Sequence, residues 1–214
     1  MMTNIEINKI LYGAREYERM HWCGVRIMKH PTDLWAYQHY LWSTKVNVLI
    51  ECGAGYGGSA IYFRDCMRLM RGAAAKVISV SFPELPVLQN QSQLVSIVGR
   101  STDPDIVRRV LAEIQSTDRV MVSLDSGHHA ENVLAELRAY WEVVTPGCLL
   151  VVEDTNLNGN PVFARNRNSR RIQQEQGGPH EALQTFMQEN AAFIVRPDPY
   201  IVTNNPGGWL RRKE

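Results

Sequence analysis

The sequence predicts an α/β fold with a mostly parallel β-sheet and helices on both of its faces. Short apolar runs of strand length alternate along the chain with longer segments of helical periodicity, which is typical of such a sheet. In addition, a glycine cluster at 53–58 directly follows the first apolar run, as in the first strand-to-helix turn of ligand-binding sheets. The 214 residues suffice for one large domain with a sizeable core.

The expected elements begin with a buried strand over 46–52 and a helix near 57–70. Further strands are expected at 76–80, 94–98, 119–124, 148–152, 192–196 and 200–203. Further helices are expected at 104–115, 129–144 and 180–189. In the first of these helices, apolar residues recur at helical spacing from Ile106 to Ile114. Strands that alternate with helices in this way favour parallel pairing.

A polar segment at 156–178 interrupts this alternation. It has no apolar periodicity, and it contains Arg165, Arg167, Arg170 and Arg171. A connection of this length is typical of a lid, a binding loop or a solvated segment. It follows the carboxyl end of an expected core strand, where ligands of open α/β sheets bind. A lid that contacts the acceptor and a mobile solvated loop are both open interpretations.

Charge and composition exclude several classes of partner. The formal net charge is +1, so no overall field attracts nucleic acid or an anionic membrane. The longest apolar runs are strand-sized, and the amino terminus lacks the features of a signal peptide. The four cysteines have no paired spacing, which favours free thiols in a reducing compartment. We therefore expect a cytoplasmic protein without nucleic-acid or membrane partners.

The glycine cluster predicts a nucleotide-sized cradle. Glycines let the backbone turn sharply and let a ligand approach it closely. Gly53, Gly55 and Gly58 also fit the dinucleotide pattern G-x-G-x-x-G. Glu51 separates the two interpretations, because its carboxylate would repel a pyrophosphate but suits the cationic amino-acid end of S-adenosylmethionine (SAM). A glycine-rich turn without a ligand is the alternative.

Carboxylates follow two neighbouring strands of the expected sheet. Asp125 ends the fourth strand, and Glu153 and Asp154 end the fifth. If these strands pair, the three carboxylates converge and require a compensating cation. Oxygen ligands of this kind select a hard divalent ion such as Mg²⁺. In the alternative interpretation, Asp125 only caps the next helix and the other two are solvated.

His128 and His129 are candidates for proton transfer. A histidine beside a metal-bound hydroxyl can accept its proton near neutral pH. A histidine pair at a helix start is commonly a surface feature, but His128 follows Asp125 by three residues. We therefore predict that His128 is catalytic, together with Asp125.

Together these motifs resemble the cephalosporin hydroxylase family, which belongs to the SAM-dependent methyltransferases. The resemblance extends over most of the chain, and the matching pieces occur in the family's order. They are residues 22–24, 29–38, 50–53, 57–60, 99–103, 124–128, 133–137, 152–155, 178–179 and 206–210.

The resemblance implies a Rossmann-like class I methyltransferase sheet whose last strand is antiparallel. It implies methyl transfer from SAM to a hydroxyl of a small molecule, such as a sugar or a natural-product intermediate, by a homo-oligomer. An amino-terminal helical cover would span 1–45, and the methyltransferase domain, with its loop insertion at 156–178, would span 46–214.

The resemblance also implies site residues. The SAM site would contain Glu51, Gly53, Gly55, Gly57, Ser59 and Ser101, with Tyr37 and Gln38 contributed by the cover. Asp125, Glu153 and Asp154 match the family's magnesium-binding carboxylates.

One position departs from the family pattern. The second strand usually ends in an aspartate that binds both ribose hydroxyls, but here Ser81 stands there. A hydroxyl cannot supply the charge-assisted pair, a deficit on the order of 1–3 kcal/mol. Glu84 is a possible substitute for the missing acid.

Three functions follow from these observations. The first is a magnesium-assisted, SAM-dependent O-methyltransferase. The second is a catalytically degenerate or non-SAM-binding relative, which Ser81 motivates. The third is an NADP-dependent oxidoreductase, which the absence of a Tyr-x-x-x-Lys motif disfavours.

Overall fold

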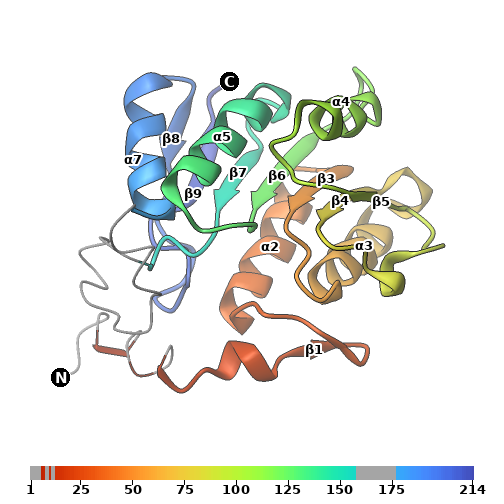
Figure 1. Cartoon of the computed structure of the whole chain (residues 1–214), viewed down its shortest axis with the longest axis horizontal. Helices are drawn as coiled ribbons and strands as arrows, with labels where there is room; N and C mark the ends of the chain where they lie inside the picture. Colours follow the sequence, from red (N-terminus) through yellow and green to blue (C-terminus); the bar gives the residue numbers. More distant parts are fainter. Residues whose placement is uncertain (1–5, 8–9, 11–12, 158–176) are drawn as a thin grey trace.

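A seven-stranded sheet forms the centre of the described structure (Figure 1). The computed structural model describes residues 6–7, 10, 13–157 and 177–214. Within these ranges the sheet has the order β5-β4-β3-β6-β7-β9-β8. Its strands are β3 (Val48–Cys52), β4 (Lys76–Ser81), β5 (Leu94–Val98), β6 (Val120–Leu124), β7 (Leu149–Val152), β8 (Phe193–Val195) and β9 (Trp209–Arg212). A separate two-stranded sheet consists of β1 (His21–Trp22) and β2 (Val25–Arg26).

The strand pairing confirms the predicted α/β sheet with an antiparallel last strand. The five strands from β5 to β7 in the sheet order pair in parallel. β9 runs antiparallel to both of its neighbours, β7 and β8. Because the chain returns from β5 to β6 on the other side of β3, the carboxyl ends of β3 and β6 border a topological switch point.

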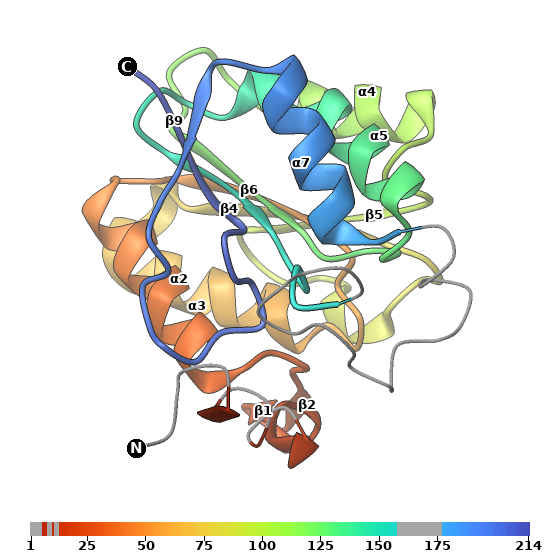
Figure 2. The ribbon, with the colours of Figure 1, turned by 90° about the vertical axis from the view of Figure 1, so that its left-hand side faces the viewer.

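Helices cover both faces of the sheet (Figures 1 and 2). One face carries α2 (Pro31–Ser43) and α3 (Gly58–Arg71), and the other carries α4 (Pro104–Ala112), α5 (Ala130–Tyr140) and α7 (Pro179–Glu189). Four short 3₁₀ helices complete the described elements. They are η1 (Glu16–Arg19), η2 (Gly72–Ala74), η3 (Pro86–Leu88) and η4 (Trp141–Val143).

The hydrophobic core includes α2. Every residue of β3 and of β6 is buried, as expected of central strands covered on both faces. Tyr37 of α2 lies with its ring centroid 4.7 Å from that of Phe63 and 5.1 Å from that of Trp209. Helix α2 therefore packs against the sheet, beside α3.

Most predicted strands agree with the structure, but the prediction of a strand at 200–203 is wrong. No strand forms there, because the backbone amide of Asn204 donates to Oδ2 of Asp33 at 2.9 Å and Thr203 Oγ1 donates to Oδ1 at 2.5 Å. The final strand is β9, which follows the turn at 206–208.

Two further expectations concern the chain as a whole. All four cysteines are free, as predicted. Among the helices of the described ranges, none combines the length and apolar character that a bilayer crossing requires. The predicted loop at 156–178, with its four arginines, lies outside the described residues except at its two ends.

Candidate active site

Two adjoining pockets open at the carboxyl edge of the parallel strands. The first, of about 380 Å³, we call the serine pocket, because its lining includes Ser81, Ser101 and Ser126. The second, of about 500 Å³, we call the acidic pocket, because its lining includes Asp125 and Asp154. Both pockets share Gly53, Ala54, Gly55, Asp125 and Ser126. An elongated ligand can therefore occupy both.

The glycine cluster forms the shared floor of the two pockets. Gly53 has φ +95°, and a Cβ there would lie 2.0 Å from the carbonyl oxygen of Asp125, so only glycine fits. Gly55 has φ +54°, and a Cβ there would meet no atom within 4 Å. Gly57, with φ +91°, precedes the first residue of α3. The open space above Gly55 allows a ligand to approach the main chain, as the predicted cradle requires.

Ser81 presents an unsatisfied hydroxyl to the serine pocket. It ends β4, is 5% exposed, and its Oγ has no hydrogen-bond partner among the described residues. A buried polar atom without a partner is costly, and a ligand hydroxyl would satisfy it. Glu84 does not take this place. It is exposed, accepts a hydrogen bond from Gln89, and does not line the serine pocket.

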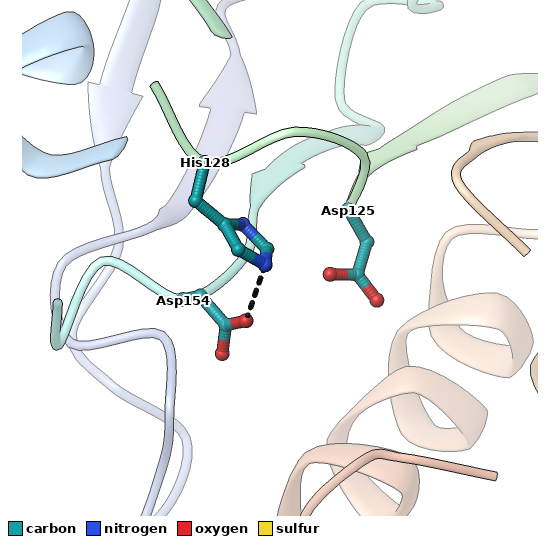
Figure 3. A group of neighbouring side chains, drawn as sticks. All are labelled: Asp125, His128 and Asp154. Carbon is teal, nitrogen blue, oxygen red and sulfur yellow. Dashed lines mark ion pairs between the residues drawn. The ribbon is translucent and has the colours of Figure 1, made fainter. Parts of the chain in front are cut away.

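Asp125, His128 and Asp154 converge at the acidic pocket (Figure 3). One ligand atom of each lies within 4.8 Å of the others. His128 Nε2 lies 3.2 Å from Asp154 Oδ2. Asp154 has φ +55°, a conformation that aspartate tolerates, and its amide donates to Asn205 Oδ1 at 2.9 Å. This backbone turn directs the Asp154 side chain to the group.

Glu153 lies in a different environment from the other two carboxylates. Lys29 Nζ lies 2.5 Å from Glu153 Oε1 and 2.6 Å from Asp125 Oδ2. The same Glu153 oxygen accepts hydrogen bonds from Tyr37 Oη at 2.6 Å and from Ser123 Oγ at 2.9 Å. The structure therefore groups His128, rather than Glu153, with Asp125 and Asp154. Lys29 lies in the matched segment 29–38, but the sequence assigns it no role, since nothing in its neighbourhood marks it as buried.

The carboxylate cluster carries excess negative charge. Burial raises the pKa of Asp125 well above its usual range, the Lys29 ammonium opposes this rise, and the Glu153 and Asp154 carboxylates add to it. Burial also raises the pKa of Asp154. Three carboxylates face one lysine here, so a divalent cation would compensate the remaining charge.

The other predicted cofactor residues are placed as follows. Ser59 lies at the start of α3 and lines the acidic pocket. Glu51 is fully buried in β3, where its Oε2 accepts from Ser79 Oγ at 2.9 Å. Neither pocket is lined by Glu51, Tyr37 or Gln38. Glu51 and Tyr37 turn instead into the interior. Glu51 accepts from Ser79 of β4, and the Tyr37 hydroxyl donates to Glu153.

The family follows from comparison with known proteins. Residues 15–213 match the family described as Rhamnosyl O-methyltransferase/CmcI. The chain belongs to this family. The rhamnosyl O-methyltransferase of Mycobacterium leprae (strain TN) is 34% identical over 217 residues, which cover 97% of this chain and 90% of the relative.

Solved structures share the fold. An apo structure of CmcI has a TM-score of 0.67 at 20% identity, and the match covers 92% of this chain and 77% of that one. A structure of CmcI with Mg and SAM has a TM-score of 0.63 at 18% identity, covering 92% of this chain and 78% of that one. These matches confirm the predicted methyltransferase sheet. Together with the family match, they confirm the resemblance to the cephalosporin hydroxylase family.

Proposed function

We propose that this chain methylates a hydroxyl of a sugar, with SAM in the two pockets and Mg²⁺ at Asp125 and Asp154. Its family makes the chain a SAM-dependent O-methyltransferase. One observation supports the site assignment most directly. The Asp125–His128–Asp154 group lies in a pocket that shares a glycine floor with the serine pocket. A methyl donor and a hydroxyl acceptor can meet there.

The two pockets assign a direction to the cofactor. The reacting sulfonium must lie near the metal-binding group, so the amino-acid end belongs on the side of the acidic pocket. The nucleoside end then occupies the serine pocket, with the ribose near Ser81 and the adenine near Ser101. The main chain at Gly53 and Gly55 and the start of α3 at Ser59 would contact the methionine part.

The donor atoms at the acidic pocket fit a magnesium ion. Asp125 and Asp154 supply oxygen ligands, as Mg²⁺ prefers, and water or the acceptor can complete its shell. When bound, such an ion lowers the pKa of a coordinated hydroxyl. His128 would hold the proton that the acceptor loses, and the Asp154 carboxylate, 3.2 Å from its Nε2, would stabilise the imidazolium.

The acidic pocket offers groups that suit a sugar. Its lining includes the ring of Tyr56, which is 51% exposed. The Arg26 guanidinium carbon lies 4.6 Å from the centre of this ring, and Arg26 Nη1 donates to its hydroxyl at 3.2 Å. An exposed aromatic face flanked by polar groups can pack on a sugar ring and bind its hydroxyls. The rhamnosyl O-methyltransferase relative indicates the same acceptor class.

Homo-oligomerisation and a cytoplasmic location are part of the proposal. The first rests on the family resemblance. The second rests on the four free thiols, two of them fully buried, which suit a reducing compartment.

Calorimetry with SAM, S-adenosylhomocysteine and NADPH tests the cofactor, and transfer of labelled methyl to a rhamnoside tests the reaction. We expect the first two ligands to bind, NADPH not to bind, and excess chelator to stop transfer. Binding without any transfer would support the degenerate relative instead, and NADPH binding would favour the oxidoreductase.

A matched pair of variants tests the proton acceptor. His128→Ala should lower the transfer rate by about 10²- to 10⁴-fold. His129→Ala should preserve it, because His129 lines a different cavity with Arg100 and Glu131. Equal rates in the two variants would remove His128 from the mechanism.

A further inference from the structure

A buried carboxylate lies behind the serine pocket and is not used in the proposed reaction. Glu136 of α5 has no exposed surface. Its Oε1 accepts hydrogen bonds from Ser126 Oγ, at 2.6 Å, and from Ser101 Oγ. Both serines line the pocket, so the carboxylate contacts the pocket only through their hydroxyls.

These hydrogen bonds determine what the two serines can offer a ligand. A hydroxyl has one proton and two lone pairs. Because Ser101 and Ser126 both donate to Glu136, only their lone pairs are left for the pocket. Ser126 Oγ already accepts from Asn132 Nδ2 at 3.0 Å. Ser101 is therefore the stronger acceptor toward a ligand.

Ser101 is held in place by its backbone as well. Tyr140 Oη donates to the Ser101 carbonyl oxygen at 2.7 Å, and Ser101 is only 6% exposed. Glu136 and Tyr140 lie one turn apart on α5. This helix therefore fixes both the backbone and the hydroxyl of Ser101. Such a preorganised acceptor can discriminate between a donor and an acceptor on the ligand.

The cost of this arrangement points to a role in binding rather than in stability. The second carboxylate oxygen, Oε2 of Glu136, is buried and has no hydrogen-bond partner among the described residues. A buried carboxylate with an unsatisfied oxygen destabilises the fold relative to an apolar side chain of similar size. The effect of this carboxylate on the pocket is to fix the orientation of the Ser101 and Ser126 hydroxyls.

We infer that Glu136 is a positioning residue that makes the serine pocket select the exocyclic amine of adenine over the exocyclic oxygen of hypoxanthine. The inference rests on the proposed function, which places the adenine beside Ser101. The amine donates to the Ser101 lone pair. The oxygen of hypoxanthine would face that lone pair with one of its own. The serine could turn to donate to it only by giving up its hydrogen bond to Glu136, whose buried carboxylate would then keep a single donor, Ser126.

Binding of S-adenosylhomocysteine and S-inosylhomocysteine, measured by calorimetry on the whole chain, tests the inference. We expect the unmodified protein to prefer the adenine ligand at least about tenfold. Glu136→Gln keeps an acceptor oxygen and should keep the preference. Glu136→Met removes the acceptor and should reduce the ratio of the two dissociation constants toward one. A purely structural role would weaken both ligands equally and leave the ratio unchanged.

Ser101→Ala provides the second test, should Glu136→Met fail to fold. It removes the acceptor itself and should also reduce the ratio. A ratio near one in the unmodified protein, or an unchanged ratio in Ser101→Ala or a folded Glu136→Met, would overturn the inference while leaving the proposed function intact. If S-adenosylhomocysteine did not bind at all, the proposed function would fail, and the inference with it.

Discussion

The Lys29 ammonium nitrogen lies 2.5 Å from Oε1 of Glu153, inside a site that also contains Asp125 and Asp154. Lys29 is 3% exposed and Glu153 is 5% exposed, so water screens this ion pair little. Lys29 Nζ also lies 2.6 Å from Asp125 Oδ2, so its single charge bridges two of the three carboxylates that converge at the edge of the sheet. The negative charge that remains is left for an added cation.

We predict that Lys29→Met destabilises the fold by about 3–5 kcal/mol, because it leaves Glu153 buried without a counter-charge. Urea unfolding of the unmodified protein and the variant measures the difference. The double variant Lys29→Met with Glu153→Gln should recover part of the loss, since it removes the uncompensated carboxylate. A stability of Lys29→Met within about 1 kcal/mol of the unmodified protein would show that water or a proton already compensates Glu153.

We predict that Asp154→Asn weakens Mg²⁺ binding by at least about tenfold, because an amide lacks the charge that attracts the ion. Calorimetric titration with Mg²⁺ measures this directly. Glu153→Gln is the matched control, and it should weaken binding less, since Lys29 occupies that carboxylate. If both variants weakened binding equally, Glu153 would be a ligand, as the sequence predicts, and Lys29 would have to move when the ion binds.

We predict that Ser81→Asp tightens S-adenosylhomocysteine binding by about ten- to a hundredfold. The Ser81 hydroxyl lies buried and unpaired at the end of β4, and a carboxylate there could accept from both ribose hydroxyls. Calorimetry gives the affinity. Ser81→Asn has a similar shape without the charge and should gain less. Unchanged affinity in Ser81→Asp would mean that the ribose does not contact this position.

The sequence predicted the sheet well because its central strands are strand-length runs of mostly apolar residues, such as β3 and β6. Strand β9 was harder to predict, because it contains Arg211 and Arg212 after only two apolar residues. The structure shows why arginine is tolerated there. The Arg212 guanidinium donates to the carbonyl oxygens of Glu142 at 2.6 Å and of Val144. These contacts join segments far apart in the chain, which local patterns do not reveal.

The candidate site was only partly predictable for the same reason. Asp125 and Asp154 could be found because Asp125 directly follows β6 and Asp154 comes just after the end of β7, and the carboxyl ends of parallel strands meet at one edge. The orientation of Glu153 could not be found. It depends on Lys29, which is 124 residues away in the sequence, and on the Tyr37 hydroxyl.

The last prediction concerns the pH dependence of stability. Burial raises the pKa of Glu136 from 4.5 to about 7, and the hydrogen bonds from Ser101 and Ser126 oppose this rise. The folded state therefore binds the proton more tightly than the unfolded state. The resulting stabilisation is fully present below pH 4.5 and is lost as the pH rises to about 7. It amounts to on the order of 3 kcal/mol.

Glu136→Gln cannot titrate, so its free energy of unfolding should rise relative to that of the unmodified protein across this interval. Asp33, whose pKa burial also raises to about 7, contributes equally to both proteins and cancels in the difference. Urea unfolding at several pH values measures it, and a difference that did not change with pH would show that Glu136 titrates alike in the folded and unfolded chains.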